Sequence, residues 1–318
     1  MSATPTLTGP EAVPGHAVPR SRGDRLFSGT ARVAALVIVA ALAGVFVFLA
    51  LEGFPGLTQA AATYAPNDTF LSYVAPLVFG TILSSVLALI LAVPFAFGIA
   101  LFISHYAPRR LAVPVAYVID LLAAVPSVVF GLWGGRALAE YLVPVQAWLD
   151  QHLSFLPFFK GPASVTGRTM FTAGIVLAIM MLPIITAISR EVFAQTPRLH
   201  EEAALALGAT RWEAIRLAVF PYARSGMVSA VMLGLGRALG ETMAVAMVLS
   251  ASPIVTLNLI SNTNPATVAS NIASSFSEAT PSKLHVLIAT GLVLFAVTFV
   301  VNFAARWVVG RNERRMAR

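Results

Sequence analysis

The sequence predicts an all-α membrane protein with six transmembrane helices, from its composition, its uncharged stretches and the placement of its arginines. Hydrophobic residues make up 58% of the 318 residues and charged residues only 11%, far below the roughly 25% typical of soluble proteins. Several uncharged stretches reach the length of about 20 residues that a helix needs to cross a bilayer. Lipid is therefore the expected surrounding for most of the chain.

The N-terminal end differs in composition from the rest of the chain. Residues 1–24 are rich in Pro, Thr, Gly and Ala and show no apolar periodicity, so we expect a disordered cytoplasmic tail. We do not expect a cleavable signal peptide, because the first apolar run begins too far from Met1. Residues 25–318 are then one transmembrane domain.

The first two predicted spans are long apolar helices. Residues 33–51 are all uncharged and can cross a bilayer core. The second span runs from about residue 77 to 104, and its Pro94 predicts a kink.

The third predicted span, about residues 113–138, is less regular because it contains Asp120, Pro126 and several glycines. We expect it to be broken or buried in the bundle, since lipid cannot satisfy freed backbone groups. We assign no transport role to Asp120. Three further spans are predicted at residues 170–189, 226–249 and 286–305.

The distribution of basic residues predicts the orientation. With a cytoplasmic N-terminus, sixteen of the twenty-one Lys and Arg residues lie inside, as the positive-inside rule expects. Four lie outside and Arg237 lies within a span. Both termini are then cytoplasmic, and the formal charge of +7 follows from topology, so no nucleic-acid partner is expected.

Several classes of chemistry lack the residues they require. The absence of cysteine excludes disulfides and thiolate sites. The five histidines lack metal-ligand spacing, and no catalytic constellation emerges, so we expect no metal, cofactor or catalytic residue. A phosphate cradle of the form G-x-x-x-x-G-K-[ST] is also missing, so ATP and magnesium would be bound by a partner.

The longest internal loop, residues 196–221, predicts two short helices. Thr196 is expected to cap the first helix, and Gly208 to end it in a left-handed conformation. Thr210 and Glu213 have the spacing of a capping box for the second helix.

Pro221 is expected to close the same unit. On local physics alone, an amphipathic loop on the membrane surface explains the segment equally well. However, the order Glu202-Ala203-Ala204, then Gly208, then Phe220-Pro221 resembles the EAA loop of the permeases of binding-protein-dependent ABC importers. In that family the loop is a coupling helix that docks on an ATPase. The resemblance implies an ATPase contact formed by Glu202, Ala203, Ala204, Gly208 and Pro221.

Arg237 and Glu241 are four residues apart in the fifth predicted span and would share one helical face. A charge at mid-membrane costs about 2.5–3.5 kcal/mol, so it normally faces a pathway or another charge. A structural ion pair is one interpretation. The other is a pathway for an anion, with Arg237 as the fixed charge, Glu241 as its counter-ion and Thr242 as a hydroxyl donor. Ser127 in the third span is a candidate pathway hydroxyl.

The segment Gly236-Arg-Ala-Leu-Gly-Glu-Thr-Met-Ala-Val245 resembles a signature of the PstC family, the permease subunits of phosphate importers. Segments 124–133 and 187–192 resemble the same family, and the resemblance covers roughly residues 24–310. It implies phosphate as cargo and several partners: a PstA-like second permease, a PstB-like ATPase dimer and a PstS-like phosphate-binding protein.

Other interpretations stay open at this point. Another oxyanion, sulfate or molybdate, could be the cargo. A secondary anion transporter could use Arg237 and Glu241 as a proton relay, although the EAA-like loop argues against it. The external segment, residues 140–168, could be a docking surface for the binding protein or an interfacial aromatic anchor.

Overall fold

The computed structural model describes residues 22–316 of the chain. The predicted tail, residues 1–24, lies outside this range except for its last three residues, which begin the first helix. The chain forms two compact units, Met1–Phe48 and Leu49–Arg318. In the first unit the described residues belong to one helix, α1 (Arg22–Gly53), which includes the predicted first span and ends in the second unit.

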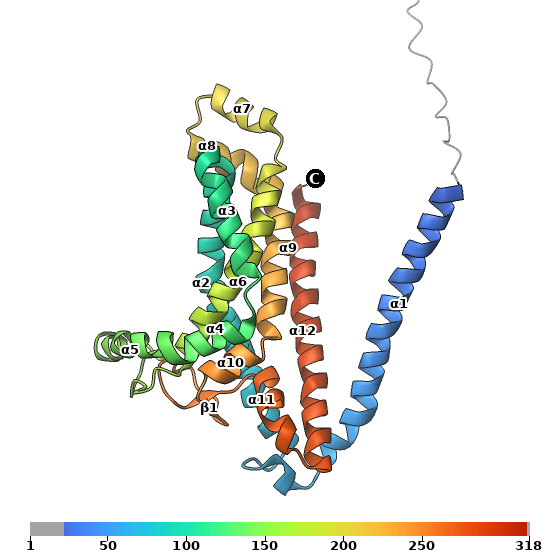
Figure 1. The fold of residues 1–318 in the computed structure, drawn as a ribbon, viewed down its shortest axis with the longest axis vertical. Helices are drawn as coiled ribbons and strands as arrows, with labels where there is room; N and C mark the ends of the chain where they lie inside the picture. Colours follow the sequence, from blue (N-terminus) through green and yellow to red (C-terminus); the bar gives the residue numbers. More distant parts are fainter. Residues whose placement is uncertain (1–21, 317–318) are drawn as a thin grey trace, which may run out of the picture. The chain divides into compact units, whose positions relative to one another are not determined.

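The second unit is built from helices and one small sheet (Figure 1). Its α-helices, in chain order, are α2 (Phe70–Leu101), α3 (Arg109–Ala123), α4 (Ser127–Trp133), α5 (Ala139–Leu153), α6 (Met170–Ala194), α7 (Arg198–Ala206), α8 (Arg211–Ala214), α9 (Phe220–Leu239), α10 (Met243–Val248), α11 (Val268–Ser275) and α12 (Pro281–Met316).

Shorter elements join these helices. Three π turns extend α2, α4 and α8: η3 (Phe102–Tyr106), η4 (Gly134–Leu138) and η5 (Ile215–Val219). The 3₁₀ turns are η1 (Phe54–Thr58), η2 (Ala61–Tyr64) and η6 (Phe276–Glu278). The parallel strands β1 (Ala251–Ser252) and β2 (Asn264–Pro265) have two residues each, and the sequence did not predict them.

The prediction of an all-α membrane protein with six spans is confirmed. Within the described residues, six helical stretches are long and apolar enough to cross a membrane: Leu26–Thr58, Phe70–Tyr106, Ser127–Leu153, Met170–Ala194, Arg211–Leu239 and Pro281–Trp307. Four of them overlap the predicted spans closely, whereas the fifth, Arg211–Leu239, shares only its second half with the predicted 226–249. The third differs, because its helical stretch extends beyond the predicted end into the segment interpreted as external.

That third region is broken, as its composition predicts. α3 ends at Ala123, and Pro126 precedes α4, because the residue before a proline is pushed out of helical geometry. α5 then runs across the view of Figure 1, at a steep angle to α2, α6 and α12. The first part of the predicted external loop is therefore a helix.

The core is centred on α6, which packs along α2 and α9. Ala88, Ala92, Ala96 and Ala100 recur every four residues along α2, and each is at most 1% exposed. Residues at this spacing lie on one helical face. Their small side chains let α2 approach α6 closely, as in many membrane helix pairs. Thr186 on α6 donates a hydrogen bond to the carbonyl of Ala96 at 3.4 Å.

We predict that replacing Gly80 by Ala destabilises the second unit. The new Cβ would overlap the carbonyl oxygen of Ala266, a backbone atom that cannot rotate away. Overpacking of this kind costs about 1–3 kcal/mol, which should lower the thermal unfolding midpoint of the purified protein in detergent. Gly98 lies in the same helix with open space around it, so G98A is the matched control. Equal midpoints for the two variants would contradict the close contact.

Candidate functional site

Two regions contain the residues that the sequence singled out. The first, which we call the α7–α8 unit, comprises residues 196–221. Gly208 separates its two helices and has φ of +88°, in the left-handed region, as predicted. Its amide donates to Leu205 O at 2.9 Å, and the amide of Ala209 donates to Ala204 O at 3.2 Å. The chain therefore reverses direction within this turn.

The capping box at the start of α8 is also confirmed. The amide of Glu213 donates to Thr210 Oγ1 at 3.3 Å, and the amide of Thr210 donates to Glu213 Oε2 at 2.7 Å. Two amides that a helix start would leave unpaired are thus satisfied.

The predicted cap at Thr196 is wrong. Pro197 is the N-cap of α7, and no side chain caps this helix. The amide of Thr196 donates to Phe193 O at 3.2 Å, so this residue completes the last turn of α6 instead. Its hydroxyl is buried and has no hydrogen-bond partner in the described part of the chain.

Pro221 does not close the unit either. It is the second residue of α9, which continues from α8 through η5 without interruption. A proline ring normally clashes with the carbonyl four residues earlier. Here the preceding turn is a π turn, in which the amide of Phe220 bonds Ile215 O, five residues back. We attribute the tolerance of Pro221 to this wider turn.

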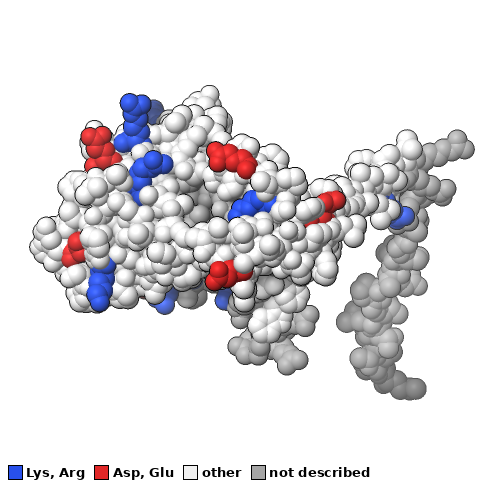
Figure 2. Space-filling view, turned by 90° about the horizontal axis from the view of Figure 1, so that it is seen from below, with Lys and Arg blue, Asp and Glu red and all other residues white. Residues whose placement is uncertain are grey.

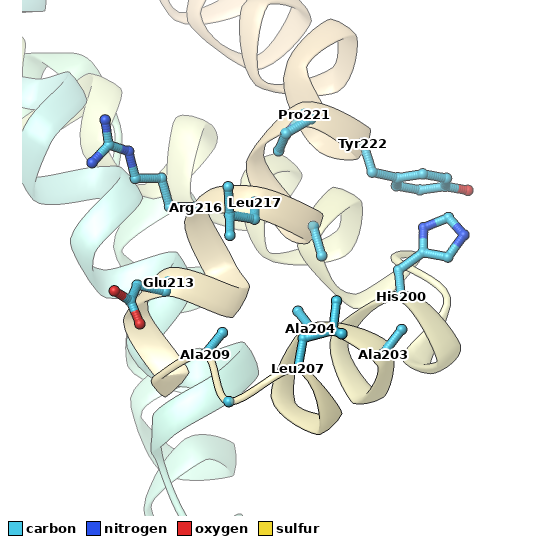
Figure 3. A pocket seen from close by; sticks show the side chains of 12 residues that line it. His200, Ala203, Ala204, Leu207, Ala209, Glu213, Arg216, Leu217, Pro221 and Tyr222 are labelled. Carbon is cyan, nitrogen blue, oxygen red and sulfur yellow. The ribbon is translucent and has the colours of Figure 1, made fainter.

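A groove of about 1140 Å³ lies between α7 and the start of α9. Figure 3 shows that Ala204, Leu207 and His200 reach it from α7, while Leu217 and Tyr222 reach it from the other side. Ala203 also lines it, so small side chains open one wall. Glu202 does not line this groove; it is exposed at a second cavity, beside Glu201, and forms no hydrogen bond or ion pair within residues 22–316.

The second region is the end of α9. The sequence predicts one continuous helix over 226–249, with Arg237 and Glu241 on one face, and this prediction is wrong. α9 ends at Leu239 and α10 begins at Met243. Glu241 is 8% exposed, and its Oε1 accepts from the amide of Ala244 at 3.2 Å. The carboxylate therefore caps the next helix, which favours a break over continuation.

Arg237 and Glu241 are not paired. Arg237 is exposed and forms no hydrogen bond or ion pair in the described part of the chain. Thr242 turns its hydroxyl back to Gly240 O at 3.0 Å. Arg237 and Glu241 therefore form no ion pair with each other and do not share a helical face.

Close packing joins α4 to α10. An ideal Cβ on Gly131 would lie 2.8 Å from the Cα of Ala244, and one on Gly135 would lie 2.5 Å from Met247 O. Both contacts advance in the same direction, so the two helices run parallel. Extrapolated one helical turn back, this register places Ser127 beside the break between α9 and α10.

Comparison with known proteins identifies the architecture. Residues 92–318 match the family described as the binding-protein-dependent transport system inner membrane component. The chain belongs to this family. It is therefore a multi-pass inner membrane permease, one component of a system that also contains a binding protein.

Individual relatives agree with the family. The phosphate transport system permease protein PstC 2 of Mycobacterium tuberculosis is 49% identical, over 96% of this chain and 98% of its own length. The PstC of Mycobacterium leprae is 45% identical (91% and 94% covered), and that of Mesorhizobium japonicum is 36% identical (92% and 91% covered). The permease therefore belongs with the PstC proteins.

A solved structure of the MetNI methionine ABC transporter in inward-facing conformations is also similar. Its TM-score is 0.49 at 17% identity, over 73% of this chain and 90% of that chain.

Some polar contacts of the permease were not foreseen. Asp120 Oδ2 lies 3.8 Å from Arg190 Nη2 of α6, which ties α3 to the core helix. Arg168 Nη2 donates to Met247 O at 2.6 Å, at the end of α10. A charge within or beside an apolar span is a signal that a partner must exist, but it does not identify that partner.

We predict that Gly208→Val loosens the α7–α8 unit. A β-branched residue at positive φ costs about 1–2 kcal/mol, so backbone amides of α7 and α8 should exchange with deuterium about 5- to 30-fold faster. Gly208→Asn is the matched variant and should cause a smaller change, because asparagine tolerates this conformation better. Unchanged exchange in the valine variant would contradict the strained turn.

Proposed function

We propose that this permease is a subunit of an ATP-driven phosphate importer and forms half of its translocation pathway. The observation that carries the proposal is the 36–49% identity, over more than nine-tenths of the chain, to proteins named phosphate transport permeases. The other half would be a PstA-like permease. A PstB-like ATPase dimer and a PstS-like binding protein would complete the system.

The α7–α8 unit would face the cytoplasm. Arg198, Arg211, Arg216 and Arg224 lie in or next to it, and basic residues favour the cytoplasmic side. In Figure 1 this unit and the end of α12 lie at the same end of the second unit. Figure 2 views the opposite end, where single acidic and basic residues are scattered over a mostly uncharged surface.

In this orientation the α7–α8 unit would receive the ATPase. Ala203 and Ala204 present little bulk, which permits close approach, and Glu202 is free to bond a partner. Gly208 sets the angle between the two helices. Pro221 lies in a continuous helix, so displacement of α8 would pass directly into α9. ATP and magnesium would be bound by the partner.

The break between α9 and α10 would belong to the phosphate pathway. An exposed guanidinium without a counter-ion is costly within a span unless it faces a pathway or a partner subunit. Arg237 could donate two parallel hydrogen bonds to a tetrahedral oxyanion. Ser127 and Thr242 would offer hydroxyls nearby. Glu241 would act indirectly, by holding the start of α10.

We predict that Arg237→Ala lowers the initial rate of phosphate uptake at least about tenfold, because hydrogen bonds to a charged group contribute about 1.5–3 kcal/mol. The assay is uptake of labelled phosphate by vesicles that contain the assembled complex, with recovery of each subunit measured in parallel. Arg306→Ala is the control, since Arg306 is an exposed arginine near the end of α12. Normal uptake by R237A would remove this residue from the pathway.

We also predict that Glu202→Arg reduces co-purification of the ATPase from membranes. A reversed charge on the proposed contact repels whatever group Glu202 meets. Glu191→Arg makes the same change on exposed α6 surface and should retain the ATPase. Equal recovery with both variants would assign the contact to other residues.

A further inference from the structure

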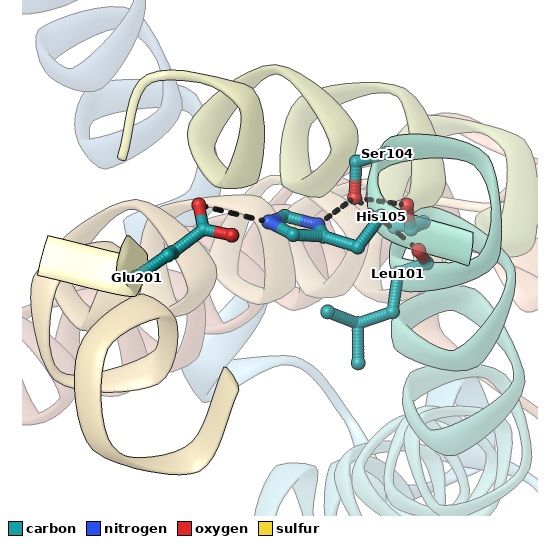
Figure 4. A network of polar contacts seen from close by, with 5 residues as sticks. Leu101, Ser104, His105 and Glu201 are labelled. Atoms are coloured by element: carbon teal, nitrogen blue, oxygen red, sulfur yellow. Dashed lines mark hydrogen bonds and ion pairs between the residues drawn. The ribbon is translucent and has the colours of Figure 1, made fainter. Parts of the chain in front are cut away.

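A polar chain joins α7 to the end of α2 (Figure 4). Glu201 Oε1 lies 3.5 Å from Nε2 of His105, which is in the π turn η3. The other ring nitrogen, Nδ1, lies 2.7 Å from Ser104 Oγ, and Ser104 Oγ donates to Ala100 O at 2.8 Å. The imidazole is thus held at both nitrogens, between the α7–α8 unit and the backbone of α2.

Neighbouring glutamates of α7 differ in exposure and in contacts. Glu201 is half-buried and turns toward its own chain, whereas Glu202 is exposed and unpaired. The His105 and Glu201 side chains are 12% and 27% exposed. The first carboxylate is therefore committed to an internal contact, while the second remains available to a partner.

The space around this contact is not tightly packed. A cavity of about 360 Å³ is lined by both glutamates, Glu201 and Glu202, together with Ser104, His105 and Thr196, among others. α7 itself packs mainly on α8 and η5. Of the ion pairs between described residues, the pair of His105 and Glu201 is the one that α7 forms. Apolar packing thus contributes little to the connection between α7 and α2.

The chain of contacts ends at the core. Ala100 is the last alanine of the α2 face that packs on α6. Together with Phe193 of α6 and Val219 of η5 it forms a buried cluster. Displacement of Glu201 would therefore act on the point where three elements of the bundle meet.

We propose that His105 and Glu201 are positioning residues that carry displacement of α7 into α2, alongside the covalent route through α8 into α9. This inference rests on the proposed function of the α7–α8 unit. The chain itself links α7 to α6, through residues 195–197, and to α9, through α8, but not to α2. Driving α2 as well keeps the α2–α6 pair aligned with α9 during each cycle.

The test uses the whole complex in vesicles with inorganic phosphate as the probe. ATP hydrolysed per phosphate transported is measured, together with ATPase co-purification. His105→Gln and Glu201→Gln should each raise the ATP consumed per phosphate about two- to fivefold, the size expected from one partly exposed contact between ionisable side chains, while the ATPase stays bound. The double variant should be no worse than either single variant, because both remove one shared contact.

Two controls separate this role from a structural one. Glu191→Gln removes an exposed carboxylate at the same end and should keep the parent ratio. His105→Lys offers Glu201 a positive partner and should restore most of the coupling. An unchanged ratio in the glutamine variants, additive effects in the double variant or loss of the bound ATPase would each overturn the inference. If the unaltered complex itself fails to move phosphate, the proposed function fails instead.

Discussion

The packing of α2 on α6 is the constraint on which the rest of the permease depends. The alanine face of α2 leaves no room for larger side chains, and α6 is the most deeply buried helix. At one end of α6, Gln146 of α5 is buried among Gly167, Thr169 and Thr172 and bonds all three. At its other end, Thr196 completes the last turn before α7. One rigid pair thus positions both the external segment and the α7–α8 unit.

The chain has two helix breaks next to the α2–α6 pair, one before α4 and one before α10, and each has a local cause in the backbone. Pro126 ends helical geometry before α4, and Glu241 caps α10. The two short helices can then lie against each other because Gly131 and Ala244 present so little bulk. The start of α10 is thereby held against α4.

Most of the fold was predictable because span length and arginine placement are properties of single segments. Gly208 and the box of Thr210 and Glu213 were predictable for the same reason, since turn and cap chemistry is local. The predictions at Thr196, Pro221 and the shared face of Arg237 and Glu241 failed because packing decided them. The sequence of residues 226–249 allowed a continuous helix. The carboxylate of Glu241, however, bonds forward to the start of α10, and this bond stabilises a break between α9 and α10. The contact between His105 and Glu201 joins residues nearly a hundred positions apart, and no local signal could reveal it.

The three π turns change the direction in which the side chains of the following helices point. Each holds one more residue than an α-helical turn would, and successive residues of a helix differ in direction by about 100°. η5 lies between α8 and α9, so the direction in which Arg237 faces is set eighteen residues earlier, at Val219. Deleting one residue there would leave the composition of α9 untouched and still turn its guanidinium by about 100° around the helix axis. The direction of Arg237 in the candidate pathway therefore depends on the geometry of η5, a turn that lies outside that pathway.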